Sequence, residues 1–356
     1  MTGRRRRVQA ALATLVGLAL VVSACGDDDD VDATAPESVK VRLLTHDSFA
    51  LSDGVLDRLR EESGIELEVI AAGDAGSVVN QAILTASDPL ADVLYGVDST
   101  FLGRALAEDL FVPYEAAGLD AVPTALQLDP QHRVTPIDVG DVCVNYDRAH
   151  FGEELAAPTT LESLTDAEYR GLTVVENPAT SSTGLAFLLA TVAEYGADGW
   201  RDYWQRLRDN DVLVADSWED AYYGAFSAGG GGDRPIVVSY ASSPPADVVF
   251  AEDGRTEPAI GVVEQSCYRQ VEFAGILRGT AEADAAERVV DFLLSPAVQA
   301  DIPLQMFVFP ARADVELPEV FERWAARPVD PYELELDVVD ARRDEWIEEW
   351  TDLVVR

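Results

Sequence analysis

Short apolar runs alternate with amphipathic stretches along most of the chain after residue 39. Apolar runs bounded by polar or turn residues are typical of strands, and apolar positions three or four apart are typical of helices. This pattern predicts strands at 41–45, 65–71 and 92–97, and helices at 52–62, 77–86 and 101–110. Such alternation predicts an α/β fold, in which helices cover a parallel sheet.

A second set of elements follows after residue 170. The pattern predicts strands at 172–175 and 236–240, and helices at 184–195, 200–209 and 334–356. Trp346 and Trp350 lie four apart in the last helix, which is the spacing of a buried stripe. Two further apolar segments, 134–146 and 266–277, are expected to be strands that cross between two lobes.

The apolar pattern at the start of the chain is of another kind. Four arginines at 4–7 precede an apolar run at 8–21, and small residues then lead to Cys25. This order is typical of a secretory signal, and about fourteen apolar residues fall short of the roughly 20 that span a bilayer. The cysteine at the cleavage point resembles the lipobox of bacterial lipoproteins. We therefore expect residues 1–24 to be removed, and Cys25 to carry acyl chains such as palmitate that anchor an extracytoplasmic protein to the membrane.

Charge separates the next segment from the rest and limits the partners. Residues 25–38 are rich in acids and hold few apolar side chains, so they are expected to form a disordered tether. The whole chain holds 65 acidic and 26 basic residues, a net charge of −39. This acidity argues against nucleic acid, because phosphate backbones require a basic patch. It is compatible with a cationic ligand, although a soluble acidic surface would look the same.

The cysteines and histidines indicate a disulfide rather than a metal centre. After lipidation Cys143 and Cys267 remain, one in each segment expected to cross between lobes. A lone pair in an oxidising compartment is more often a disulfide, and neighbouring antiparallel strands permit the required geometry. The three histidines, at 46, 132 and 150, are scattered, so no metal site is expected.

Polar segments follow most of the expected strands. Open α/β sheets bind ligands beyond the carboxyl ends of their strands. The segments at those ends are 45–49, 73–77, 96–100, 177–184, 216–218 and 239–244. Most of them combine hydroxyl groups with an acidic or aromatic side chain. This composition suits a small ligand that forms hydrogen bonds between the lobes, including a ligand with a positive charge.

These segments, taken in order, resemble the thiamine-binding proteins of bacterial ABC transporters. The matching motifs are THDSF (45–49), DAGSVVN (74–80), ADVLYGVD (91–98), NPATSSTGL (177–185), SWEDAY (217–222), VSYASSP (238–244) and SPAVQADIP (295–303). The resemblance runs from about residue 41 to residue 350.

The resemblance implies a two-lobed periplasmic-binding-protein type II fold with two hinge crossings. The first lobe is expected to comprise 39–138 and 269–356, and the second lobe 139–268. The implied function is capture of thiamine or a thiamine phosphate, and its delivery to a permease and its ATPase. The resemblance implies a monomeric binding protein with neither catalytic residues nor a cofactor.

Four of the expected ligand contacts concern a cationic ring. Trp218 and Tyr240 match two ligand-contacting aromatics of the family, and an aromatic face attracts the thiazolium cation by cation–π contact. Asp74 and Asp98 lie at strand ends, where carboxylates balance a cation. Helix capping is an equal alternative for both aspartates.

The remaining expected contacts include both family features and departures. Ser181 opens an apolar helix and matches the family's phosphate end, since a helix start binds anions; a serine cap without a ligand is the alternative. His46, Ser243 and Phe307 complete the walls. Enteric members of the family have Tyr where this chain has His46, another aromatic near Ala246, and Trp where it has Phe307. These departures leave open a related ligand, such as a pyrimidine precursor.

Two other functions were compared with this one. The adjacent Tyr222 and Tyr223 suggest a ferric-ion binder of the same superfamily. However, the tyrosine pair of ferric-ion binders corresponds to residues 239–241 of this chain. A polyamine-binding protein of the same superfamily is a comparable alternative. A lipid-anchored hydrolase finds no support, because no Gly-x-Ser-x-Gly, Ser-x-x-Lys or His-Glu-x-x-His motif occurs in the sequence.

Overall fold

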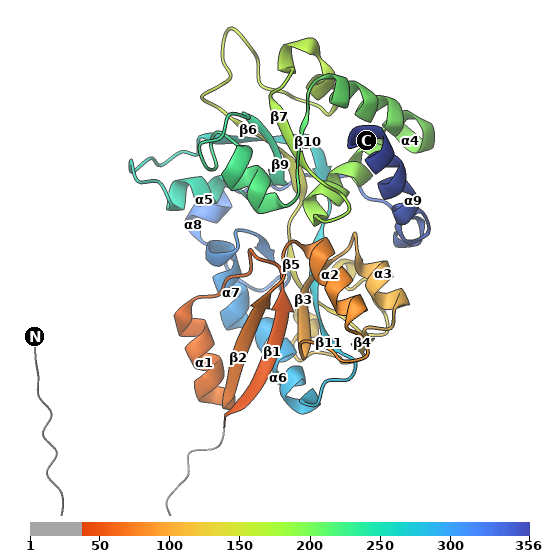
Figure 1. The fold of residues 1–356 in the computed structure, drawn as a ribbon. Coiled ribbons are helices and arrows are strands. Elements are labelled where there is room, and N and C mark those ends of the chain that lie inside the picture. Colours follow the sequence, from red (N-terminus) through yellow and green to blue (C-terminus); the bar gives the residue numbers. More distant parts are fainter. Residues whose placement is uncertain (1–37) are drawn as a thin grey trace, which may run out of the picture. The chain divides into compact units, whose positions relative to one another are not determined.

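The computed structural model describes residues 38–356 (Figure 1). The predictions for the signal segment, Cys25 and nearly all of the tether lie outside these residues. The strands are β1 (Val39–Thr45), β2 (Ile65–Ala71), β3 (Val93–Asp98), β4 (Phe111–Val112), β5 (Thr135–Val139), β6 (Val142–Asp147), β7 (Thr173–Glu176), β8 (Leu213–Ala215), β9 (Ile236–Tyr240), β10 (Ile260–Tyr268), β11 (Val271–Leu277) and β12 (Phe309–Pro310). The α-helices are α1 (Asp53–Ser63), α2 (Ala75–Leu84), α3 (Leu102–Ala107), α4 (Ser182–Asp209), α5 (Pro244–Val249), α6 (Ala283–Leu293), α7 (Pro296–Gln305), α8 (Glu319–Trp324) and α9 (Leu336–Val354). Short helical turns are η1 (Leu119–Ala121), η2 (Thr124–Leu126), η3 (Glu162–Thr165), η4 (Ala167–Tyr169) and the π-helical η5 (Asp220–Ala225).

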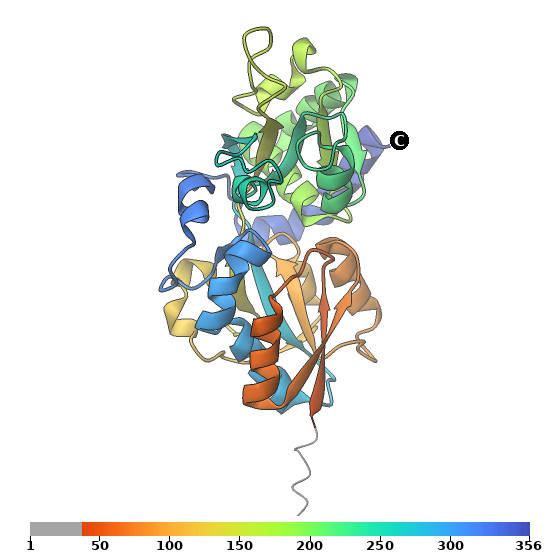
Figure 2. The same ribbon diagram turned by 90° about the vertical axis from the view of Figure 1, so that its left-hand side faces the viewer.

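The first lobe is built on a sheet with the order β12-β5-β11-β3-β1-β2, and β4 pairs with β11. β1 is parallel to β2 and β3, as the sequence predicts, whereas β11 returns antiparallel to β3 and β5. Neighbouring side chains of β1 face opposite sides: Leu43 packs in the cluster that contains α1, α6 and α7, and Leu44 in the cluster that contains α2 and α3. Figure 2 shows α1 and α7 side by side.

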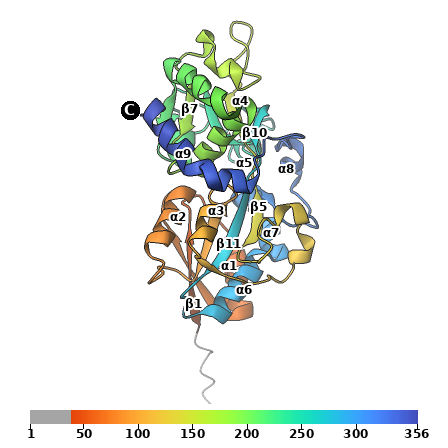
Figure 3. The ribbon, with the colours of Figure 1, turned by 90° about the vertical axis from the view of Figure 1, so that its right-hand side faces the viewer.

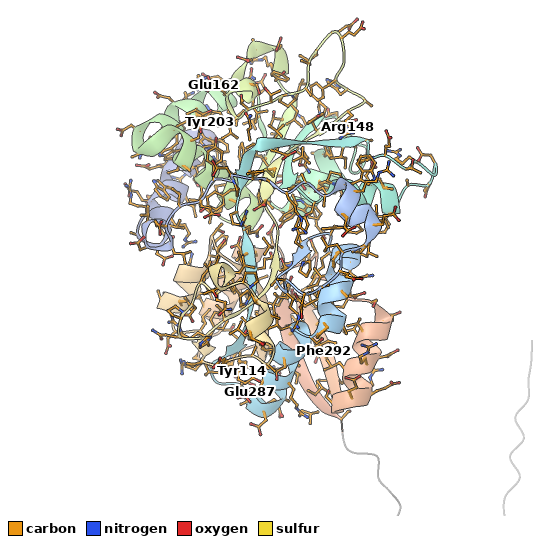
Figure 4. The ribbon with its side chains drawn as sticks, turned by 180° about the vertical axis from the view of Figure 1, so that it is seen from behind. Tyr114, Arg148, Glu162, Tyr203, Glu287 and Phe292 are labelled. Atoms are coloured by element: carbon orange, nitrogen blue, oxygen red, sulfur yellow. A yellow bond between two sulfur atoms is a disulfide. The ribbon has the colours of Figure 1, made fainter. Side chains whose placement is uncertain are left out.

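The second lobe is built on a sheet with the order β10-β6-β9-β7-β8. The sequence predicts two helices at 184–195 and 200–209, but one helix, α4, covers both and kinks at Gly196, whose φ is 72°. The loop before η3 packs on α4, because the Tyr203 hydroxyl donates a hydrogen bond to the Leu161 carbonyl over 3.1 Å. Glu162 pairs with Arg206 beside it; Tyr203 and Glu162 are labelled in Figure 4.

Two neighbouring crossings join the lobes. The chain passes from β5 to β6 through residues 140–141 and from β10 to β11 through residues 269–270. β5 pairs with β11 in the first sheet, and β6 pairs with β10 in the second, both antiparallel. Next to the crossings a disulfide bond joins Cys143 to Cys267, whose Cα atoms are 4.1 Å apart.

The C-terminal helix connects the lobes a third time. Trp346 and Trp350 of α9 are buried, as their spacing predicts, and Trp350 meets Trp204 of α4 with ring centroids 5.4 Å apart. α9 packs mainly on α4 and also touches α3 (Figure 3). The helix α9, which the sequence analysis groups with the first lobe, thus buries its apolar stripe mainly on α4 of the second lobe. No helix in residues 38–356 combines the length and apolarity needed to cross a bilayer.

Candidate functional site

A cavity of about 220 Å³ lies between the two lobes, beside the crossings. The first lobe contributes the ends of β1 and α7 and the loop before α2, and the second lobe contributes the loops after β8 and β9. The wall consists of His46, Asp47, Ser48, Gly73, Asp74, Ala75, Tyr95, Ser182, Ser217, Trp218, Glu219, Tyr222, Tyr223, Tyr240, Ser243, Ala246, Phe250, Glu272, Gln305, Met306, Phe307 and Val308. Of the expected contacts, six line it: His46, Asp74, Trp218, Tyr240, Ser243 and Phe307.

An aromatic wall comes from the second lobe. The Trp218 and Tyr222 rings are stacked, with centroids 4.9 Å apart and planes 23° apart, and Tyr240 lies 6.1 Å from Trp218. The indole Nε1 of Trp218 donates a hydrogen bond to Ser239 Oγ over 2.9 Å, and this hydroxyl lies 3.0 Å from Ser243 Oγ. The indole is therefore held in one orientation, with aromatic faces available to a planar cation.

Asp74 combines the two roles that the sequence left open. One carboxylate oxygen accepts a hydrogen bond from Ala75 N over 2.7 Å and so caps α2. The other accepts a hydrogen bond from Trp218 N in the opposite lobe over 2.9 Å. Ser48 and Glu219 make a second contact between the lobes, with their side-chain oxygens 3.3 Å apart. The lobes therefore touch across the cavity.

Carboxylates in and beneath the floor of the cavity lie close to His46. His46 Nε2 lies 3.4 Å from Glu272 Oε2. The Tyr95 hydroxyl lies within hydrogen-bonding distance of Asp138 and 3.1 Å from Glu272. Burial alone lowers the pKa of His46, but the charge and hydrogen bond of Glu272, with smaller contributions from Asp74 and Asp138, raise it to about 8. Burial and Glu272 raise the pKa of Asp138 well above its ordinary range.

Asp98 does not line the cavity. Its Oδ1 accepts hydrogen bonds from Thr100 N, Thr100 Oγ1 and Phe101 N over 2.7–3.2 Å, and its Oδ2 accepts one from Gln270 Nε2 over 2.8 Å. The capping alternative therefore describes Asp98, because both carboxylate oxygens are occupied inside the protein. Burial, opposed by these hydrogen bonds, raises its pKa to about 7.

Ser181 also does not line the cavity. Ser181 is completely buried as the residue before α4, and its Oγ lies 2.9 Å from Thr183 Oγ1. The next residue, Ser182, lines the cavity instead. The helix begins at Ser182, two residues before the predicted start, and the turn before it points the hydroxyl of Ser181 inward.

The mouth of the cavity has an aromatic pair that joins the lobes. Phe307 of the first lobe meets Phe250 of the second, with ring centroids 5.4 Å apart. Phe250 is 70% exposed and follows α5 one helical turn after Ala246, which also lines the cavity. The aromatic that the family resemblance places near Ala246 is therefore absent at that position, but the ring of Phe250, directly after the same helix, lines the cavity.

Several wall residues were not among the expected ligand contacts. Tyr222 had a signal, because it follows Trp218 at helical spacing. Glu272 also had one: it is the single acid in the apolar segment 266–277, which is expected to cross between lobes. A charged residue in a buried strand is costly unless it is paired. Tyr95 carried no such signal, because an aromatic residue in a buried strand is ordinarily part of the core.

The described residues do not gather three or more His, Cys, Asp or Glu side chains in a geometry that could hold a metal ion. Tyr222, one of the tyrosines that suggested iron, is stacked on Trp218.

The chain is similar to known solute-binding proteins over most of its length. A family described as "Bacterial extracellular solute-binding protein" matches residues 88–330. The thiamine-binding periplasmic protein of Salmonella typhimurium is 30% identical over 88% of this chain and 93% of its own, and that of Escherichia coli is 30% identical over 91% and 96%. A solved structure of a periplasmic thiamin binding protein matches with a TM-score of 0.77 and 28% identity, covering 89% of this chain and 96% of its own.

Proposed function

We propose, since the chain belongs to the bacterial extracellular solute-binding protein family, that it captures thiamine in the cavity between its lobes and delivers it to an ABC importer. One observation carries the proposal: within the described residues, the cavity wall combines seven aromatic side chains and four carboxylates with no lysine or arginine. The similarity to two thiamine-binding periplasmic proteins over about nine-tenths of the chain supports it.

The wall suits the charge and shape of thiamine. Thiamine has a planar aminopyrimidine and a thiazolium ring with a permanent positive charge. Contact of such a cation with Trp218, Tyr222 or Tyr240 contributes about 0.5–2 kcal/mol per well-placed ring. Glu272 and Asp74 supply the negative charge that an organic cation requires once water is excluded, because a buried cation is costly without a counter-ion. In this proposal the rings select a flat ligand and the carboxylates select a positive one.

Release to a transporter requires the lobes to separate. The contacts that cross the cavity are few and polar or aromatic: Asp74 with Trp218, Ser48 with Glu219, and Phe307 with Phe250. Each involves a wall residue, so ligand binding and closure are coupled through the same side chains. Hinge closure around a ligand is the usual behaviour of two-lobed binding proteins.

The proposed location is outside the cytoplasm. The signal-like segment 1–24, the acidic residues that follow and the disulfide between Cys143 and Cys267 are consistent with export to an oxidising compartment. In this proposal Cys25 carries the lipid anchor, and the acidic residues after it hold the binding domain away from the membrane.

A titration followed by tryptophan fluorescence tests the function. We expect thiamine to change the emission, because Trp218 lies in the wall. Spermidine and Fe³⁺ serve as the competing ligands, since a polyamine shares the cationic charge and ferric-ion binders share the superfamily. Calorimetry with the same three ligands supplies the affinities. Saturable binding of Fe³⁺ or spermidine, with no heat or fluorescence change from millimolar thiamine, would reject the proposal.

A further inference from the structure

The cavity wall carries a single basic side chain. Among the described residues that form the wall, His46 is the only histidine, and neither lysine nor arginine occurs. His46 directly follows β1, and its ring packs against the backbone of β3, since a Cβ at Gly96 would overlap the imidazole. The Tyr95 ring lies beside it, with ring centroids 5.5 Å apart. The His46 side chain is only 13% exposed, so the imidazole is held in the wall.

Glu272 is the charged partner of His46. His46 Nε2 lies 3.4 Å from Glu272 Oε2. The other donors beside this carboxylate are uncharged: the Tyr95 hydroxyl lies 3.1 Å from Oε2, and Gln270 Nε2 lies 3.5 Å from Oε1. When the imidazole is protonated, His46 is therefore the cation that balances Glu272.

Three further acids lie near His46, and each has other partners. Asp74 and Asp47 accept backbone hydrogen bonds, and Asp138 of β5 accepts one from the Tyr95 hydroxyl. Burial, and next the charge of Glu272, raise the pKa of Asp138 well above its ordinary range, so this acid adds little negative charge. Glu272 is therefore the carboxylate that decides the charge of the imidazole.

The same carboxylate faces the space that the ligand is proposed to occupy. Glu272 and His46 both line the cavity, as do Trp218 and Tyr240. Burial, and next the charge of Glu272, raise the pKa of the Tyr240 hydroxyl well above its ordinary range. Glu272 thus acts on the aromatic wall that would hold a thiazolium ring. A cation on this wall and a proton on His46 would both lie close to one carboxylate.

Two positive charges beside one carboxylate repel each other. Burial lowers the pKa of His46, but the charge and hydrogen bond of Glu272 outweigh burial and raise it to about 8, so the imidazole is charged at neutral pH before a ligand binds. A neighbouring like charge favours the neutral form of a titratable group. A permanently cationic ligand therefore favours transfer of the His46 proton to solvent.

We infer that His46 is a specificity-determining residue of the cavity, because its proton and the positive charge of the ligand compete for Glu272. This inference rests on the proposed function and deepens it. Loss of the proton frees Glu272 to balance a cation, whereas a neutral ligand gains nothing from this change. The preference of the cavity for a cationic ligand over a neutral one therefore increases as the pH rises and His46 becomes neutral.

Calorimetry with thiamine tests the inference by counting protons. Heats of binding at pH 7.2, in two buffers of different ionisation enthalpy, give the number of protons released. We expect about 0.5–1 proton per thiamine, and an affinity that rises at least about fivefold from pH 6.5 to pH 8.5. A constant affinity without proton release would overturn the inference and leave the proposed function intact. If thiamine binds at none of these pH values, the proposed function fails, and the inference fails with it.

A neutral ligand tests the specificity. The aminopyrimidine alcohol that remains when the thiazolium ring is removed has no permanent charge, and competition against thiamine measures its affinity even when it binds weakly. We expect the thiamine-to-alcohol affinity ratio to rise at least about fivefold over the same pH range. A constant ratio would overturn the inference, because the pH would then act on the protein and not on the charge of the ligand.

A pair of variants assigns the effect to His46. His46→Gln removes the titrating group, and His150→Gln makes the same change at an exposed histidine outside the wall. At pH 6.5 we expect His46→Gln to bind thiamine at least about fivefold more tightly than the wild type, because Glu272 then has no competing cation. His150→Gln should match the wild type. Asp98, whose pKa is about 7, is present in all three proteins and cannot cause the difference. Equal or weaker binding by His46→Gln at pH 6.5 would refute the competition.

Discussion

The carboxylate of Asp74 accepts a hydrogen bond from the backbone N–H of Trp218, 2.9 Å away in the opposite lobe. Asp74 also caps α2, and Trp218 carries the indole that lines the cavity. A single acceptor thus links a helix start in the first lobe to the aromatic wall of the second. Closure and ligand contact therefore depend on the same two residues.

Replacement of Trp218 by alanine should weaken thiamine binding. The change removes a cation–π contact and buried apolar area, together worth about 2–3 kcal/mol, or roughly 30- to 150-fold in affinity. Calorimetry measures the loss. Trp218→Phe is the matched control and should lose much less, because it retains an aromatic face. Thiamine affinity unchanged in Trp218→Ala would show that the ligand lies elsewhere.

Gly76→Ala should impair closure. The added Cβ would meet the Thr180 carbonyl at 2.7 Å and the Phe101 ring at 2.8 Å; the ring can tilt, whereas the carbonyl belongs to the opposing backbone. We expect thiamine to dissociate at least tenfold faster, and small-angle scattering to show less compaction with ligand.

Gly54→Ala is the control for Gly76→Ala. Both glycines are the second residue of a helix, but a Cβ at Gly54 meets nothing within 4 Å. Alanine in a helix is ordinarily about 1 kcal/mol better than glycine, so this control should be as stable as the wild type or slightly more. Equal dissociation rates in the two variants would show that Gly76 is not a contact that limits closure.

His46 should make stability depend on pH. Its pKa is raised from 6.5 to about 8 in the folded protein, so its contribution is complete below pH 6.5 and is lost as the pH rises through about 8. The shift corresponds to about 2 kcal/mol. Urea unfolding at pH 6 and pH 9 should therefore show a larger loss of stability for the wild type than for His46→Gln. Asp98 also titrates in this range, but it is present in both proteins. Identical pH dependence would contradict a charged pair of His46 and Glu272.

The disulfide between Cys143 and Cys267 should contribute to stability. It closes a loop with a sequence separation of 124 residues. Constraint of so long a loop in the unfolded chain is worth about 2–5 kcal/mol. The double variant Cys143→Ser, Cys267→Ser should lose this amount in urea unfolding. Two free thiols in the denatured, unreduced domain, titrated with Ellman's reagent, would show that the bond does not form.

Cys25→Ser should release the protein from the membrane, because acyl chains on one cysteine are the proposed anchor. Cell fractionation with a high-salt wash is the measurement. Cys143→Ser is the control, and it should stay in the membrane fraction. Retention of the Cys25→Ser protein after the wash would place the anchor elsewhere.

Local patterns in the sequence determined the class of fold and most of its elements. The alternation of apolar runs located β1 to β3 and their helices, because burial of one face imposes a periodicity that is visible in the chain. Trp346 and Trp350 were recognisable as a buried stripe for the same reason. The ordered motifs from residue 45 to residue 303 carried the family, and six of eight expected contacts line one cavity. In each case the signal lay within a few neighbouring residues.

Tertiary structure decided what depends on distant partners. The carboxylates of Asp74 and Asp98 both follow strands, yet only that of Asp74 faces the cavity, because Gln270 and Thr100 occupy that of Asp98. Ser181 and Ser182 are adjacent, and the direction of one turn places only Ser182 in the wall. The pairing of His46 with Glu272 joins residues 226 positions apart. Packing of α9 on α4 likewise depends on contacts that sequence periodicity cannot assign to a lobe. Side-chain direction and long-range pairing follow from how the whole chain packs, and no local pattern encodes them.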